Sequence, residues 1–188
     1  MRVLGIPAAA VLAAVLIVLP AQQVSAGLFD SVFSPGPQRP QVVGRHLVSM
    51  PPGYKPGTIF VQFSRARLYY ILSSGRAISY PIAAPKGEAR WSGETYVSDK
   101  RVNPGWTPTA EMRQENPDLP AYVPGGHPRN PLGVRAMYLG KSLYRIHGTD
   151  APWSIGQAVS HGCIRMFNQD VADLYQRVPI GTPVVVAW

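Results

Sequence analysis

The sequence contains almost no cysteine and few acidic residues. Cys163 is the only cysteine among 188 residues, so no disulfide can form within the chain. Ten aspartates and glutamates stand against 18 lysines and arginines, which gives a formal net charge of +8. The sequence also lacks the Cys-x-x-Cys and His-Glu-x-x-His motifs of common zinc sites. These absences argue against a disulfide-stapled scaffold and against a zinc hydrolase.

No dense basic run is present, although the chain is basic overall. The lysines and arginines are scattered singly, and no nucleic-acid-binding motif accompanies them. A basic chain can bind nucleic acid, an anionic membrane or an anionic wall polymer. The export predicted below argues against nucleic acid. Peptidoglycan, which is rich in carboxylates, is the better match, and an ordinary solvated basic surface explains the charge equally well.

Residues 1–26 are predicted to be a secretory signal peptide. Arg2 gives a positive start, residues 8–19 form an apolar run, and Val-Ser-Ala at 24–26 suits cleavage after Ala26. An uncleaved membrane anchor is the alternative, but the apolar run is shorter than the ~20 residues of a membrane span. We therefore expect an exported protein of the periplasm or cell envelope.

Proline and glycine are abundant, with 20 and 18 residues, and they favour short strands joined by many turns. We predict a mainly β domain, preceded by a proline-rich linker or arm at residues 27–56. One helix is predicted at 169–178, after the cysteine, with Asn168 as its N-cap. Runs of β-branched and aromatic residues predict strands, the first three forming a meander, at 58–63, 68–72, 76–82, 134–139, 143–146 and 184–187.

The segment 147–168 holds the residues best suited to covalent chemistry. A thiol attacks carbonyls as the thiolate, and a nearby imidazole is the usual device for generating it at neutral pH. His147 lies far enough before Cys163 for the chain to leave and return, so the two side chains can face each other. Gly162 permits a tight backbone that exposes the sulfur and directs amide N–H groups at a reacting oxygen. A buried inert cysteine and an intermolecular disulfide are the alternatives for an unpaired thiol in an exported protein.

The same segment resembles the signature of the bacterial L,D-transpeptidase catalytic domain, the YkuD-like family. The resemblance extends over about residues 57–187. It implies a mixed β-sandwich with a helix after the nucleophile. The matching residues are His-Gly-Thr at 147–149, Gly156, Ser-His-Gly-Cys-Ile-Arg at 160–165, Asn-Pro-Leu-Gly at 130–133, Asn-Gln-Asp-Val at 168–171 and Gly-Thr-Pro-Val at 181–184.

The resemblance implies acyl transfer through a thioester on Cys163, with His147 as proton donor and acceptor and no cofactor. The expected donor is a peptidoglycan tetrapeptide stem that loses its terminal D-Ala. The acceptor is an amine of another stem or of an envelope protein. Carbapenem β-lactams are expected to acylate the thiol. An L,D-carboxypeptidase, in which water replaces the amine, and a wall-binding module without activity remain alternatives.

Other residues near the signature receive weaker roles. His161 is expected to support the nucleophile's loop, and Arg165 either binds a substrate carboxylate or pairs with Asp170 or Asp173. Zinc bound by His147, His161 and Cys163 is a further alternative, although we predict no metal site.

Three more residues are candidates for the substrate side of the site. Ser160 and Thr149 are candidates for hydrogen bonds that orient the histidines. Tyr138 lines the pocket or belongs to the core.

Residues 103–133 and 84–95 each leave two interpretations open. Residues 103–133 contain seven prolines and form a long loop, which we interpret either as a lid over the groove or as a stiff surface loop with an exposed His127. Many relatives of the resembled family carry Thr-Pro-x-Gly near residues 84–95, and this chain does not. Trp91 in that segment either faces the substrate or packs in the domain.

Overall fold

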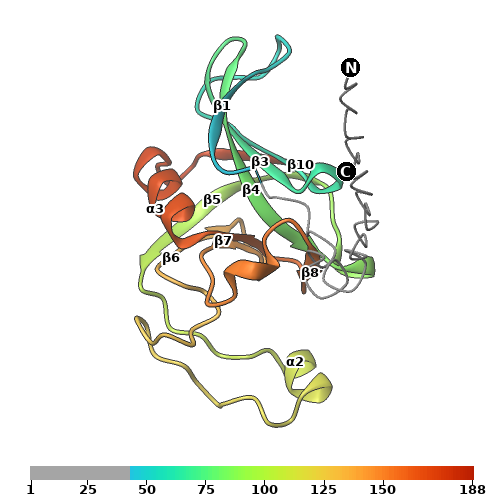
Figure 1. Ribbon diagram of the computed structural model, residues 1–188, viewed down its shortest axis with the longest axis vertical. Helices are drawn as coiled ribbons and strands as arrows, with labels where there is room; N and C mark the ends of the chain where they lie inside the picture. The colour runs from blue at the N-terminus through green and yellow to red at the C-terminus, as the bar shows by residue number, and fades with distance from the viewer. Residues whose placement is uncertain (1–42) are drawn as a thin grey trace, which may run out of the picture. The chain divides into compact units, whose positions relative to one another are not determined.

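Ten strands and two α-helices make up residues 43–188, which are the residues that the structure, a computed structural model, describes (Figure 1). The predicted signal peptide and residues 27–42 of the predicted arm lie outside the described residues. Within residues 43–188, no helix combines the length and the apolar character needed to cross a membrane.

The elements follow one another in this order: β1 (His46–Ser49), β2 (Ile59–Gln62), β3 (Arg67–Ser73), β4 (Arg76–Pro85), β5 (Gly93–Val102), α2 (Ala110–Glu115), β6 (Arg135–Leu139), β7 (Arg145–His147), β8 (Ala158–Ser160), β9 (Ile164–Met166), α3 (Asn168–Arg177) and β10 (Pro183–Ala187). Short 3-10 turns lie between several of them.

The strands form one mixed sheet in the order β1-β4-β3-β2-β10-β5-β6-β7-β9, with β8 beside β4. Strand β9 also pairs with β4, so the sheet closes on itself and takes a barrel-like form. Pairs β10–β2, β7–β9 and β4–β8 are parallel, and the others are antiparallel. The predicted mainly β architecture with a helix after the cysteine is confirmed, as is the opening meander of β2, β3 and β4.

The core lies inside this closed sheet and under α3. Strand β2 alternates between buried and half-exposed residues, so Ile59 and Val61 point inward. Helix α3 buries Val171 and Leu174, as the predicted apolar face requires, and lies against β6 and β7. Fully burying an aliphatic side chain of this kind contributes about 1.5–3 kcal/mol. This packing holds α3 against β7, the strand that ends in His147.

Asn168 does not cap α3, and the prediction that it does was wrong. Phe167 occupies the N-cap position without a side-chain bond. The Asn168 side chain turns back instead: Oδ1 accepts from the N–H of Thr149 at 3.0 Å, and Nδ2 donates to the Thr149 carbonyl at 2.8 Å. A Cβ on Gly148 would collide with this Oδ1. Asn168 therefore ties the start of α3 to the backbone that follows His147.

Strand β5 had no counterpart among the predicted strands. Its sequence, Gly-Glu-Thr-Tyr-Val-Ser-Asp-Lys-Arg-Val, is mostly polar, and only Val97 is buried. The strand exists because β10 and β6 pair with its two sides. Local composition carries little sign of such a strand, since its backbone hydrogen bonds come from partners distant in sequence.

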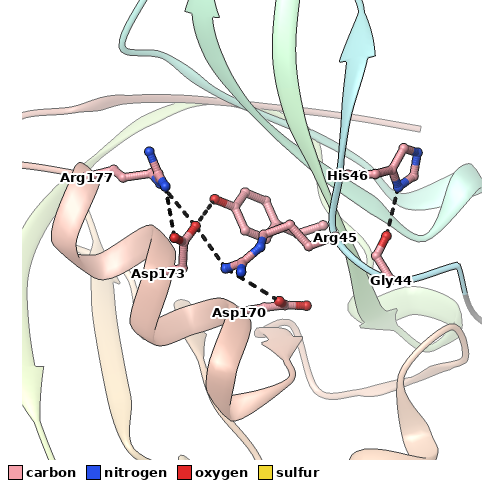
Figure 2. A network of polar contacts seen from close by, with 7 residues as sticks. Gly44, Arg45, His46, Asp170, Asp173 and Arg177 are labelled. Atoms are coloured by element: carbon pink, nitrogen blue, oxygen red, sulfur yellow. Dashed lines mark hydrogen bonds and ion pairs between the residues drawn. The ribbon is translucent and has the colours of Figure 1, made fainter.

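The start of the described chain is fastened to α3 by ion pairs (Figure 2). Arg45 lies 3.1 Å from Asp173, and Arg177 makes two hydrogen bonds to the same carboxylate. The buried Tyr80 hydroxyl donates to Asp173 at 2.6 Å. Burial, together with this hydrogen bond, raises the pKa of Tyr80, so the phenol stays protonated and acts as the donor. Part of the predicted 27–56 arm thus belongs to the folded domain, and β1 pairs with β4.

Replacing Asp173 by alanine should destabilise the domain by about 1–3 kcal/mol, because the buried Tyr80 hydroxyl loses its acceptor. The matched control is Arg177→Ala, which breaks a partly exposed ion pair and should cost less than about 1 kcal/mol. Urea unfolding followed by tryptophan fluorescence measures both. Equal losses in the two variants would contradict the role of the Tyr80–Asp173 bond.

Candidate active site

The parallel pairing of β7 with β9 organises the site. Ile146 pairs with Ile164 and His147 with Arg165. Both isoleucines are fully buried and belong to the core cluster. Because side chains alternate between the two faces of a strand, His147 and Arg165 point to the opposite face.

The same register, continued back by one residue, places Cys163 opposite Arg145. Arg145, His147, Cys163 and Arg165 therefore share one face of the strand pair, and all four line a cavity of about 310 Å³. The structure therefore places His147 and Cys163 in the lining of one cavity. The full lining comprises Trp106, Met112, Glu115, Asn116, Leu119, Pro131, Leu132, Arg145, His147, Ser160, His161, Cys163 and Arg165.

Residues 103–133 form the opposite wall of this cavity, and they carry α2 away from the sheet in Figure 1. The buried Asn130 side chain holds the loop in shape by donating to the carbonyls of Pro104, at 2.8 Å, and Pro124, at 3.0 Å. Trp106 and Val123 form a β-bridge inside the loop. The part that this loop plays in the cavity wall supports its interpretation as a lid. His127 is exposed, as expected for a residue of a surface loop.

The lid touches the nucleophile's loop through the hydrogen bond between Glu115 and His161. Glu115, the last residue of α2, lies 2.7 Å from Nε2 of His161 and 3.7 Å from Nζ of Lys86. The hydrogen bond from His161 lowers the pKa of Glu115. His161 therefore contacts the lid, in keeping with a supporting position beside Cys163 rather than that of a second base.

Burial and two arginines set the state of the Cys163 thiol. Burial raises the pKa of the thiol, and the charges of Arg145 and Arg165, with the Arg145 N–H groups, only partly oppose this rise. The sulfur lies 3.9 Å from the carbonyl of Leu143. The resting thiol is consequently protonated at neutral pH, which differs from the expected thiolate.

His147 is buried and uncharged. Burial lowers the pKa of His147 to about 3, and the nearby charges of Arg165 and Arg145 contribute, while the carbonyls of Gly148 and Pro131 offset part of the shift. Its Nδ1 lies 2.6 Å from the Gly148 carbonyl, so Nδ1 carries the proton and the lone pair is on Nε2. The cavity therefore contains a neutral imidazole and a neutral thiol.

Gly162 is required by the backbone and by its neighbour. Its φ is +115°, and a Cβ at this position would overlap the ring of Tyr144. Any side chain would push the residue before Cys163 away from the strand pair.

The predicted hydrogen bonds from Ser160 and Thr149 to the histidines were wrong. The Ser160 hydroxyl donates to the Cys163 carbonyl, and this bond shapes the turn around the thiol. Thr149 is buried, and its hydroxyl accepts from the N–H of Ala151. Thr149 does not line the cavity.

Arg165 does not pair with Asp170 or Asp173, so that alternative was wrong. Both carboxylates pair with Arg45, and Asp173 also pairs with Arg177. Arg165 donates to the Ser154 hydroxyl at 2.9 Å. Within residues 43–188, neither Arg165 nor Arg145 forms an ion pair.

Arg145 was not predicted as a site residue, although its position two residues before His147 on a strand indicates that it shares the face of His147. Its guanidinium lies 5.0 Å from the centre of the Tyr138 ring. Tyr138 lies outside the cavity lining, so the pocket-lining alternative was wrong. It is the cross-strand partner of Arg145 on β6.

The described residues offer no metal ligand set. Among residues 43–188, no three His, Cys, Asp or Glu side chains come close enough to hold a metal ion. His147, His161 and Cys163 therefore do not form the zinc site considered as an alternative.

Comparison with known proteins identifies relatives across most of the chain. Residues 56–186 match the YkuD family, described as the L,D-transpeptidase catalytic domain. The probable L,D-transpeptidase YbiS of Escherichia coli K12 is 40% identical over 136 residues, which cover 67% of this chain and 43% of YbiS. The chain thus spans less than half the length of this curated relative.

Solved structures share the fold. A crystal structure of a probable carnitine operon oxidoreductase from Brucella melitensis is 43% identical, with a TM-score of 0.53, and the match covers 79% of this chain and 96% of that one. That description differs from the family match. The catalytic domain of the E. faecium L,D-transpeptidase acylated by ertapenem is 22% identical, with a TM-score of 0.54, over 72% of this chain and 100% of that one.

Alkylation of Cys163 by iodoacetamide should keep accelerating as pH rises past ~8.5, the ordinary pKa of a free thiol, because burial raises the pKa of this thiol. Rates are measured by intact mass from pH 5 to 10. The His147→Gln control should show nearly the same profile, since a neutral imidazole adds no charge. The contrary result is a wild-type alkylation rate that no longer changes with pH by pH 7, while the rate of His147→Gln still rises. That result would show a thiolate–imidazolium pair.

Proposed function

The chain belongs to the L,D-transpeptidase catalytic domain family, and from that premise we propose that it is a cysteine-dependent L,D-transpeptidase of peptidoglycan. One observation carries the proposal. The sole thiol and a neutral imidazole occupy the same face of β7 and β9, inside a cavity that also presents two guanidinium groups. A nucleophile, a base and anion-binding groups are what acyl transfer from a carboxylate-bearing peptide requires.

In the first half-reaction, the Cys163 sulfur attacks the amide carbonyl while Nε2 of His147 removes the thiol proton. The neutral imidazole is the form that can accept this proton. The carbonyl oxygen becomes an oxyanion, which backbone N–H groups near Gly162 and Cys163 stabilise. The oxyanion then collapses, the amine of D-Ala leaves with the proton from His147, and a thioester remains on Cys163.

In the second half-reaction, an acceptor amine attacks the thioester and gives its proton to His147. Collapse of the new oxyanion forms the new amide and expels the sulfur, which takes the proton back from His147 to restore the thiol and the neutral imidazole. The donor is a tetrapeptide stem of peptidoglycan. The acceptor is an amine of a neighbouring stem or of an envelope protein, and both agree with an exported enzyme of the periplasm or cell envelope.

Arg165 and Arg145 are proposed to recognise carboxylates of the stem peptide. A guanidinium binds a carboxylate through two parallel hydrogen bonds, and both groups face the cavity without an ion-pair partner among residues 43–188. His161 holds the lid through Glu115 and so supports the closed cavity.

Incubation of the protein with peptidoglycan should yield crosslinked stem dimers, detected by mass spectrometry of a muramidase digest. Cys163→Ala should form no dimers, and His147→Gln should lose about 10²–10⁴-fold in rate, the usual contribution of a general base. Tripeptide stems without dimers would identify an L,D-carboxypeptidase. Dimers formed equally by Cys163→Ala would exclude the thioester mechanism.

A carbapenem should form a one-to-one covalent adduct with Cys163, because its strained amide mimics the acyl donor. A solved relative is acylated by ertapenem, which supports the same chemistry here. Intact-mass spectrometry and peptide mapping locate the adduct, with Cys163→Ser as the control. An unchanged mass after prolonged exposure would count against the proposed nucleophile.

A further inference from the structure

Trp91 forms the contact that fixes the peptide bond in front of the thiol. Its indole N–H donates to the carbonyl of Gly162 at 2.9 Å. Its ring stacks on Tyr144 with centroids 4.9 Å apart and an interplanar angle of 8°, and it meets Phe63 edge-on at 6.2 Å. Trp91 does not line the cavity. It contacts the nucleophile's loop from outside the cavity, at the Gly162 carbonyl.

The orientation of this peptide decides where the Cys163 N–H points. The bond between Gly162 and Cys163 is trans, and in a trans peptide the C=O and the N–H point in opposite directions. Because the Gly162 carbonyl points at Trp91, the Cys163 N–H points away from it. Within residues 43–188, this N–H donates to no backbone or side-chain acceptor, so it is available to a ligand.

Gly162 itself cannot hold the peptide in place. Glycine has a wide choice of backbone angles, and Gly162 adopts a φ of +115° that other residues rarely adopt. Within the described chain, the hydrogen bond to the Gly162 carbonyl comes from the Trp91 side chain, 71 residues earlier. The Trp91 ring is held in position by its stack on Tyr144. The Tyr144 ring in turn lies directly against Gly162, where it would overlap a Cβ.

We propose that Trp91 is a positioning residue for the oxyanion site: its hydrogen bond to the Gly162 carbonyl keeps the Cys163 N–H directed at the reacting oxygen. The proposal rests on the proposed acylation of Cys163. When sulfur bonds to the carbonyl carbon, the electron pair of the C=O bond moves to oxygen, and the Cys163 N–H stabilises that charge. Collapse restores the C=O bond and expels the amine, which takes the proton held by His147.

Trp91 lies in the segment 84–95, which departs from the Thr-Pro-x-Gly pattern of the resembled family. The Trp91 N–H donates to the turn before Cys163. In the same region, the backbone N–H of Lys86 donates to the Ser160 carbonyl at 2.9 Å. Both contacts hold the nucleophile's loop against β4 and the segment that follows it.

The test compares two reactions of the same sulfur in Trp91→Phe, which keeps an aromatic ring on Tyr144 and removes the N–H donor. Acylation by a carbapenem builds an oxyanion, whereas alkylation by iodoacetamide does not. We expect the limiting acylation rate at saturating carbapenem to fall about tenfold, less than the ~10²–10³-fold cost of removing an oxyanion donor itself. The half-saturating carbapenem concentration and the alkylation rate should stay within about twofold of wild type.

The matched control is Trp153→Phe, at an exposed tryptophan outside the cavity lining, which should leave both reactions unchanged. Equal acylation in Trp91→Phe and wild type would overturn the inference, and so would an equal loss in both reactions, which indicates packing alone. A wild-type protein that alkylates but does not acylate would refute the proposed function instead, and with it the premise of this inference.

Discussion

The parallel register between β7 and β9 is the constraint on which the site depends. It brings His147 and Cys163 to one face of the sheet and sends Ile146 and Ile164 into the core. A one-residue slip of β9 would turn the thiol toward the core and expose Ile164, and a slip of β7 would do the same to His147 and Ile146. Burial of Ile146 and Ile164 therefore stabilises the register on which the site depends, because a slipped register would lose several kcal/mol of apolar burial.

Burial then decides how the two groups work. A charged pair is costly in a desolvated cavity, and the two neighbouring guanidinium groups oppose an imidazolium while favouring a thiolate. Desolvation dominates for both groups, so both rest uncharged. The imidazole can accept a proton only as the sulfur attacks, when the arginines and the oxyanion donors can stabilise the developing negative charge.

Short-range patterns in the sequence predict much of this, and long-range contacts account for the rest. The alternating runs predict the β2–β4 meander and the face of α3, and the signature predicts that His147 and Cys163 meet. The Asn168–Thr149 and Trp91–Gly162 bonds could not be predicted, because their partners lie 19 and 71 residues apart in the sequence. The strand β5 could not be predicted either, because it depends on its pairing with β10 and β6. Arg145 is the exception, since its spacing from His147 places both on one face.

The most direct test of the account is the protonation state of His147, measured by NMR of protein carrying ¹⁵N-labelled histidine rings and assigned with His147→Gln. The account predicts a neutral ring with its proton on Nδ1 from pH 8 down to about pH 4.5, since the pKa of His147 lies at about 3. A doubly protonated ring at pH 7 would contradict it, because the residue could then not accept the thiol proton.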